Sequence, residues 1–330
     1  MKTILLAVGG NSLIRAGEKG TAAEQLANAR RTAAETVALI CQGYHLVVTH
    51  GNGPQVGAAL LRSERAVSQV PGQPLDVCGA TSQGEIGYLL EQSLVNALSN
   101  AGLDTPVIAM LTQTLVAAND PAFQHPTKPI GPFYSRQEAE ERRRTLGWQI
   151  VEDASRGYRR IVPSPSPTEI LELSVIRDLV GHGVLVVACG GGGIPVVRRN
   201  GALVGVEAVI DKDRASSVLA SELQVDLFVI STDTDYVYLN YRKPNQTALA
   251  SVTDAELEAY LKAGQFPPGN MGPKIESVLR FLRAGGKEAI ITSCEYLSKA
   301  VAGAAGTHIY RDGEPYLEGT TIRTRVPAGG

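Results

Sequence analysis

Short apolar runs alternate with longer amphipathic segments along most of this chain. The runs predict buried strands at residues 3–8, 46–49, 106–110, 184–188, 227–231 and 289–292. Apolar residues at helical spacing predict helices over 22–42, 55–66, 82–99, 168–181 and 253–263, with further helices opening at Asp211 and ending near Gly285. Strands that alternate with helices indicate a parallel sheet covered on both faces.

Residues 119–167 interrupt this alternation. They are rich in proline and charge, and the proline-spaced run 162–167 favours an extended return strand. We therefore predict an inserted subdomain, a hinged lid that carries Lys128. A helix over 168–181, capped by Thr168, should follow it. From Tyr310 onward the chain predicts an irregular tail or a weak hairpin at 312–313.

Glycine-rich turns follow three of the predicted strands. They are Gly9-Gly10-Asn11, the run HGNGP at 50–54, and four successive glycines at 190–193. Bare backbone lets N–H groups approach an anion closely, and loops after parallel strands meet at one sheet edge. The spacing matches neither GxxxxGK[ST] nor GxGxxG. A phosphoryl group held by several loops is therefore the favoured ligand.

Charged residues stand next to these turns. Asp211-Lys212-Asp213 opens a predicted helix after the hairpin turn Asn200-Gly201, and a cation between two carboxylates suits phosphate or metal. Lys128 and Lys274 lie in loops marked by proline or glycine. A lone lysine is usually a solvated surface charge. It is the proline, glycine and aspartate neighbours of these lysines that favour a role in binding phosphate.

Composition excludes several other classes of protein. With 31 Lys+Arg against 33 Asp+Glu in 330 residues, bulk binding to nucleic acid or to an anionic membrane is disfavoured. No run is long enough to span a bilayer, and residues 4–8 are too short for a signal-peptide core. The four cysteines form no CxxC pair and predict reduced, buried thiols in a cytoplasm. Neither a histidine pair with ligand spacing nor a GxSxG nucleophile is present.

Ten motifs in order resemble the carbamate kinases of the amino acid kinase family, over roughly residues 2–309. The matching stretches are AVGGN at 7–11, HGNGPQVG at 50–57, PLDVC at 74–78, QG and IGY at 83–88, LT at 111–112, PTKPIGP at 126–132, VPSP at 162–165, CGGGGIPV at 189–196, EAVIDKD at 207–213 and MGPK at 271–274.

The resemblance implies one domain with a three-layer αβα sandwich, a mostly parallel sheet and a small protruding subdomain. It implies a homodimer that catalyses ATP + carbamate = ADP + carbamoyl phosphate with Mg²⁺, run toward ATP synthesis in the catabolism of amino acids such as arginine. Residues 1–205 would form the carbamate lobe with 119–167 as its lid, and 206–310 the nucleotide lobe, followed by a tail at 311–330.

The resemblance also implies residue roles. Carbamate and the transferring phosphoryl group would contact Gly9, Gly10, Asn11, Gly51, Asn52, Gly53, Gly190, Gly191 and Gly192. Lys212 would stabilise charge on the phosphoryl group, Lys128 would reach it from the lid, and Lys274 would meet the nucleotide phosphates. Asp211 and Asp213 would orient the lysines or support Mg²⁺, with no dedicated protein metal site. The nucleotide would lie beside Asp233, Tyr236 and Met271.

Three departures from the family pattern leave other substrates open. They are Glu85 within QGxIGY, the polar run STDTD at 231–235, and the extended tail. One alternative is a related kinase for another small carboxylate, of the acetylglutamate type. The other is a catalytically silent ligand-binding relative, which the three intact lysines disfavour.

Overall fold

The computed structural model describes residues 1–9, 13–15, 17–152, 157–267, 271–313 and 326–327. Its strands are β1 Lys2–Val8, β2 Tyr44–His50, β3 Val107–Ala109, β4 Gln113–Val116, β5 Lys128–Tyr134, β6 Ile150–Glu152, β7 Tyr158–Val162, β8 Pro167–Ile170, β9 Leu185–Val187, β10 Ile194–Arg199, β11 Ala202–Gly205, β12 Leu227–Thr232, β13 Val237–Leu239, β14 Thr247–Leu249, β15 Ser251–Thr253, β16 Glu288–Ser293, β17 Thr307–Tyr310 and β18 Val326–Pro327. Its α-helices are α1 Ala22–Cys41, α2 Gly53–Ala66, α3 Leu75–Asn100, α4 Arg136–Leu146, α5 Leu173–Gly181, α6 Lys212–Leu223, α7 Asp254–Lys262, α8 Met271–Arg283 and α9 Leu297–Val301.

The main sheet has eight strands in the order β15-β17-β16-β12-β1-β2-β9-β3. Neighbours pair in parallel, apart from the antiparallel pair β16–β17. The six strands predicted from apolar runs all belong to it. Five of them are mostly buried on both faces, which explains why their runs are continuous rather than alternating, whereas the edge strand β3 exposes Ile108.

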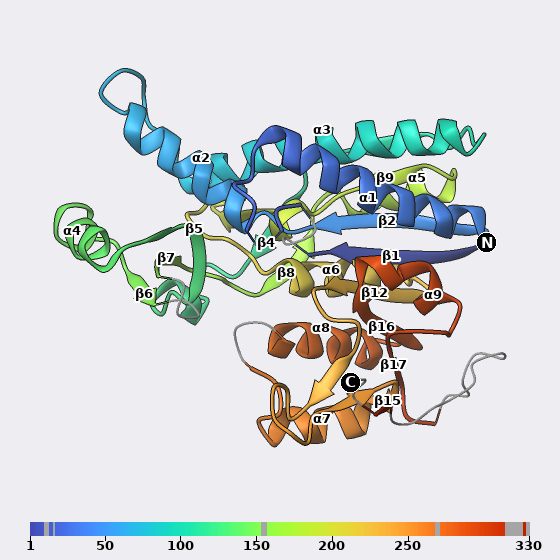
Figure 1. Cartoon of the computed structure of the whole chain (residues 1–330). Helices are drawn as coiled ribbons and strands as arrows, with labels where there is room; N and C mark the ends of the chain where they lie inside the picture. Colours follow the sequence, from blue (N-terminus) through green and yellow to red (C-terminus); the bar gives the residue numbers. More distant parts are fainter. Residues whose placement is uncertain (10–12, 16, 153–156, 268–270, 314–325, 328–330) are drawn as a thin grey trace.

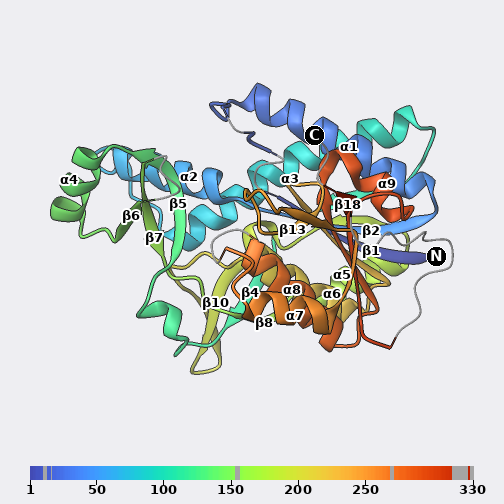
Figure 2. The same cartoon turned by 60° about the horizontal axis from the view of Figure 1, so that its bottom comes forward.

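Helices cover both faces of this sheet (Figure 1, Figure 2). On one face Ile4 and Leu6 of β1 pack in an apolar cluster with α1, α3 and α9. On the other face Leu5 and Ala7 pack with α5, α6, α7 and α8. The alternation of side chains along β1 therefore supplies both cores. This arrangement confirms the predicted three-layer αβα sandwich.

A small subdomain protrudes from one end of the sandwich, at the left of Figure 1. It contains the antiparallel sheet β5-β7-β6 and α4, whose first turn has the capping box Ser135–Glu138. Its own apolar cluster comprises Tyr134, Ala139, Trp148 and Ile150. A further sheet, β11-β10-β4-β8, lies between the subdomain and the main sheet, and its β10–β11 hairpin turns at the predicted Asn200-Gly201.

Three local predictions were wrong. Residues 167–170 form β8 instead of a helix start, because they pair with β4 and the Thr168 hydroxyl donates to the Leu115 carbonyl; α5 begins only at Leu173. The segment 271–274 was predicted as loop but is the first turn of α8, where Pro273 is tolerated. Cys41 is exposed, whereas the other three free thiols are buried as predicted.

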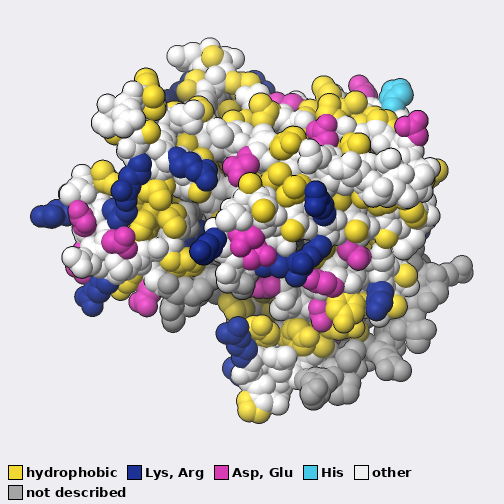
Figure 3. All heavy atoms as spheres, turned by 45° about the horizontal axis from the view of Figure 1, so that its top comes forward, with side chains coloured by type: hydrophobic (Ala, Val, Ile, Leu, Met, Phe, Trp, Pro, Cys, Tyr) yellow, Lys and Arg dark blue, Asp and Glu magenta, His cyan; other side chains and the backbone are white. Residues whose placement is uncertain are grey.

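The surface carries both charge signs. On the face shown in Figure 3, Lys and Arg side chains are interspersed with Asp and Glu over the body, as the near-zero net charge predicts. Among the described residues, no helix is long and apolar enough to cross a membrane. At the chain end, β18 pairs with β14, so the predicted irregular tail contains a short strand.

Candidate active site

Three loops meet where β1, β2 and β9 end. Gly9 follows β1 and is buried, and the Gly51 amide, after β2, donates to the Val8 carbonyl at 3.1 Å. Asn52 and Gly53 then begin α2. Because these strands are parallel neighbours, their loops share one edge of the sheet, as predicted. Gly10 and Asn11 lie outside the described residues.

The four-glycine loop after β9 is needed for close packing. Gly191, Gly192 and Gly193 have φ of +64°, +91° and +88°, values that favour glycine. A Cβ at Gly191 would lie 2.1 Å from Asn52 Nδ2, and one at Gly190 would lie 2.5 Å from His50 Nε2. The amides of Gly192 and Gly193 donate to carbonyls within the loop, so these two hydrogen bonds shape the turn itself.

Sequence reasoning missed a buried glutamine that holds this loop. Gln83 Nε2 donates to the carbonyls of Gly190 at 2.9 Å and Thr112 at 3.1 Å, and its Oε1 accepts from the Thr112 amide at 2.9 Å. Nearby, Asn52 Nδ2 donates to the Ser82 hydroxyl at 2.8 Å. Gln83 stands in the motif QGxIGY, so its motif was visible in the sequence but its role was not.

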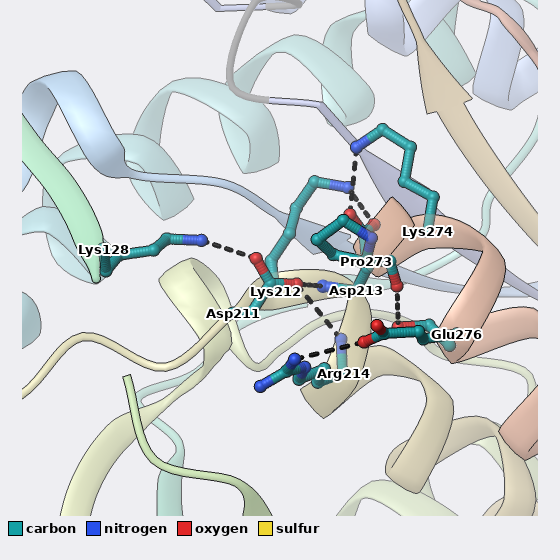
Figure 4. Close-up of polar contacts among 9 residues, drawn as sticks. Lys128, Asp211, Lys212, Asp213, Arg214, Pro273, Lys274 and Glu276 are labelled. Atoms are coloured by element: carbon teal, nitrogen blue, oxygen red, sulfur yellow. Dashed lines mark hydrogen bonds and ion pairs between the residues drawn. The ribbon is translucent and has the colours of Figure 1, made fainter. Parts of the chain in front are cut away.

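Three lysines from three elements converge on two aspartates (Figure 4). Lys128 Nζ of β5 lies 2.5 Å from Asp211 Oδ2. Lys212 Nζ of α6 lies 2.6 Å from Asp213 Oδ1, and Lys274 Nζ of α8 lies 3.0 Å from the other oxygen of the same carboxylate. The structure thus brings all five predicted charged residues together.

Asp211 also caps α6. Its Oδ1 accepts from the amides of Asp213 at 3.0 Å and Arg214 at 3.3 Å, while Oδ2 takes Lys128. The cap explains why the helix begins at Lys212. It also directs the partly positive end of the helix toward the lysines, an arrangement that favours an anion.

Burial and mutual charge shift the pKa of Asp211, Lys212, Asp213 and Lys274. Burial would raise the pKa of Asp211, but Lys128 and the other two lysines hold it well below its usual range. The pKa of Asp213 is lowered in the same way by Lys212 and Lys274 against the effect of burial. Burial lowers the pKa of Lys212, whereas the carboxylates raise that of Lys274 despite its burial. Three ammonium groups against two carboxylates leave one positive charge, which an anionic ligand would balance.

The side chains predicted for the nucleotide take no part in the ion pairs of this cluster. Asp233, in the turn after β12, is exposed, and its charge contributes to the raised pKa of Lys274. Tyr236 lies edge-to-face with Tyr238, with ring centroids 6.4 Å apart. Met271 opens α8 and packs against the apolar cluster on that side of the sheet.

Neither of the buried reactive side chains nearby is suited to charge near neutral pH. Burial lowers the pKa of His50 to about 4, against a hydrogen bond to the Gly51 carbonyl, and Lys212 acts in the same direction as burial. Burial raises the pKa of the Cys189 thiol. Glu85, the departure noted above, accepts a hydrogen bond from Gln25 Nε2 of α1 at 3.4 Å.

The chain belongs to the amino acid kinase family, whose model matches residues 2–293. It is 48% identical over 315 residues to a carbamate kinase of Thermococcus kodakarensis, covering 94% of this chain and 100% of the relative. It is 47% identical to a carbamate kinase of Trichomonas vaginalis, and the match covers 93% of this chain and 98% of the relative. Among solved structures, carbamate kinase from Giardia lamblia bound to AMP-PNP is 43% identical, with a TM-score of 0.88 and coverage of 94% and 99%.

Proposed function

We propose that this protein is a carbamate kinase that interconverts ATP + carbamate and ADP + carbamoyl phosphate. The convergence of Lys128, Lys212 and Lys274 at one helix N-terminus is the observation that carries this proposal. Three cations beside a glycine loop suit a transferring phosphoryl group, and the similar proteins reported above are carbamate kinases.

The chemistry needs positioning and charge neutralisation more than a nucleophile. In the direction of ATP synthesis, an oxygen of the ADP β-phosphate attacks the phosphorus of carbamoyl phosphate. The bond from phosphorus to the carbamate oxygen breaks, and carbamate leaves with that electron pair. Lys212 and Lys128 would neutralise charge on the equatorial oxygens, and Lys274 would neutralise the nucleotide phosphates. No proton is transferred, which agrees with a neutral His50.

We assign carbamate to the lobe that carries the loops after β1, β2 and β9, and the nucleotide to the lobe of α8. Gly9, Gly51, Asn52, Gly53 and Gly190 to Gly192 remain the proposed contacts of carbamate and the phosphoryl group. Mg²⁺ would enter with the nucleotide, bound chiefly by phosphate oxygens, because both carboxylates of the cluster are already paired with lysines. When bound, it would supply further neutralisation of phosphate charge.

We also propose that the protein is a homodimer. Helix α3 exposes Val77, Tyr88 and Val95, and the edge strand β3 exposes Ile108 beside it. Apolar side chains gathered at one sheet edge suit a self-complementary interface. Light scattering after gel filtration should give twice the mass of 34.9 kDa, and Tyr88→Glu should give monomer. A wild-type monomer at micromolar concentration would exclude this interface.

We expect the reaction to run toward ATP. We also expect the protein to work in a reducing cytoplasm, for which its thiols give the reason. The three buried thiols are free, and burial raises the pKa of Cys294 to about 11, so these groups need no oxidising compartment.

The decisive test is ATP formation by purified protein with Mg²⁺, ADP and carbamoyl phosphate. ATP should appear with a rate proportional to enzyme. Folded protein that makes no ATP above the enzyme-free control would refute the proposal, and ADP release with an acylated amino acid instead would point to another member of the family.

A further inference from the structure

The protruding subdomain sits on α2 through a backbone contact. A Cβ added to Gly57 would lie 1.9 Å from Gly131 Cα and 2.1 Å from Gly131 N, so only glycine fits at position 57 without movement. Beside this contact, Leu60 of α2 and Ile130 of β5 belong to one buried apolar cluster. The cavity left at the interface has a volume of only ≈ 10 Å³, room for about one water molecule. The subdomain is thus closely seated on the body.

One ion pair crosses the same interface. Arg160 Nη1 of β7 lies 3.1 Å from Glu64 Oε1 of α2, with side chains 21% and 29% exposed. Glu64 stands seven residues after Gly57, two helical turns along the same face. The Arg160 guanidinium lies 4.8 Å from the ring centroid of Trp148, in the core of the subdomain. Burial raises the pKa of Glu64 against the charges of Arg160 and Arg142, as expected of a carboxylate partly removed from water.

The small sheet connects this ion pair to the active site. Arg160 is the register partner of Ile130 across β5 and β7, and Lys128 lies two residues before Ile130 on β5. Paired residues and residues two apart share one face of a sheet, so Lys128, Ile130 and Arg160 all face the body. The contacts that hold Ile130 and Arg160 on α2 therefore also set the position of Lys128, which lies two residues, about 7 Å, away along β5.

We propose that Glu64 and Arg160 are positioning residues, which seat the subdomain on α2 so that Lys128 reaches the phosphoryl site beside Asp211. Neither residue touches the substrate; they act through Lys128. The proposal rests on the proposed function for its kinetic readout, but the seating itself can be measured without turnover.

A double-mutant cycle tests the positioning role. Glu64→Gln removes the charge and keeps the shape of the side chain. It should lower kcat/KM for carbamoyl phosphate by about tenfold, as expected of a misplaced group, and leave the KM for ADP within about twofold. In a Lys128→Ala background, Glu64→Gln should have an effect of less than about twofold, because the residue through which it acts is gone. The matched control is Glu140→Gln, which breaks the exposed pair with Arg136 in the same subdomain and should change nothing.

Hydrogen exchange gives the second readout. In Glu64→Gln, the amides of β5 and β7 should exchange faster than in wild type, while those of α6 stay unchanged. Gly57→Ala should do the same through its clash, whereas Gly79→Ala, a helical glycine of α3 with open space around its Cβ position, should not.

The proposal is overturned if the Glu64→Gln and Lys128→Ala effects multiply, if Glu64→Gln leaves carbamoyl phosphate kinetics unchanged, or if exchange in β5 does not respond. If the wild-type protein makes no ATP, the proposed function fails. Hydrogen exchange in β5 and β7 still shows whether Glu64 and Arg160 hold the subdomain on α2.

Discussion

Lys128 and Asp211 form an ion pair of 2.5 Å although 83 residues separate them in the sequence. The pair joins the protruding subdomain to the N-cap of α6. One aspartate therefore both begins the helix and receives the lysine of the subdomain. A substrate phosphoryl group that attracts Lys128 competes directly with the Asp211 carboxylate.

Lys128→Ala should reduce turnover and raise the KM for carbamoyl phosphate, with the KM for ADP nearly unchanged. The reason is that Lys128 reaches the site from the carbamate side, whereas Lys274 approaches from α8. Steady-state kinetics with each substrate varied in turn provide the check. A variant altered only in its dependence on ADP would place Lys128 at the nucleotide instead.

Lys212→Ala should lower kcat by about 10²–10³, the loss expected for one preorganised charge donor. Binding of ADP, followed by calorimetry, should weaken far less. Near wild-type turnover in this variant would mean that Lys212 serves only to pair with Asp213.

Asp213→Asn removes the partner of two buried lysines at once. Leaving buried charge unpaired should cost about 3–5 kcal/mol of unfolding free energy. Because ADP phosphates can replace the lost carboxylate charge, the rise in Tm on adding ADP should be larger in the variant than in wild type. Glu276→Gln, which breaks a half-exposed pair with Arg214, is the control and should change Tm little. An equal rise in Tm on adding ADP in Asp213→Asn and Glu276→Gln would contradict this explanation.

Stability should fall as the pH is lowered from 6.5 toward 4. His50 in the folded protein has its pKa depressed to about 4, so in this range the unfolded chain binds a proton that the native protein does not. Unfolding free energy therefore rises with pH, by about 3 kcal/mol across this window. Asp211 and Asp213, whose lowered pKa values matter only below the ordinary carboxyl range, contribute little here. Urea titrations of His50→Gln should show a smaller dependence of unfolding free energy on pH than wild type. An identical dependence would mean that other groups cause the loss of stability.

Gly191→Ala and Gly201→Ala compare two glycines with positive φ. Gly201 has open space around it, so its substitution should cost only backbone strain, about 1–2 kcal/mol. At Gly191 the added methyl also meets Asn52 at 2.1 Å, so the loss of unfolding free energy should be clearly larger and activity should fall with it. Equal losses would show that the loop can move away from Asn52.

The local pattern of the sequence was enough to predict most individual elements. Continuous apolar runs located six strands of the main sheet, and five of these lack polar alternation because they are buried on both faces. The predicted helix 253–263 begins where expected because its capping box, Thr253–Glu256, is encoded within four residues. Asn200-Gly201 was recognised as a turn for the same reason, since positive φ at both positions is a local property. Lys128 and Lys274 were noticed from the proline and glycine beside them, and Lys212 from its two aspartate neighbours.

Only the tertiary structure decided which of these pieces meet. Residues 167–170 became a strand because β4 offered hydrogen-bond partners, which overrode a helical pattern. Gln83 became the support of the glycine loop, and Lys128 and Lys274 came to the two aspartates, through contacts between elements far apart in the chain. Periodicity specifies which face of an element is buried, but the partner on that face is selected by packing and charge summed over the whole fold. The pKa shifts of Asp211, Lys212, Asp213 and Lys274 arise only in that assembly.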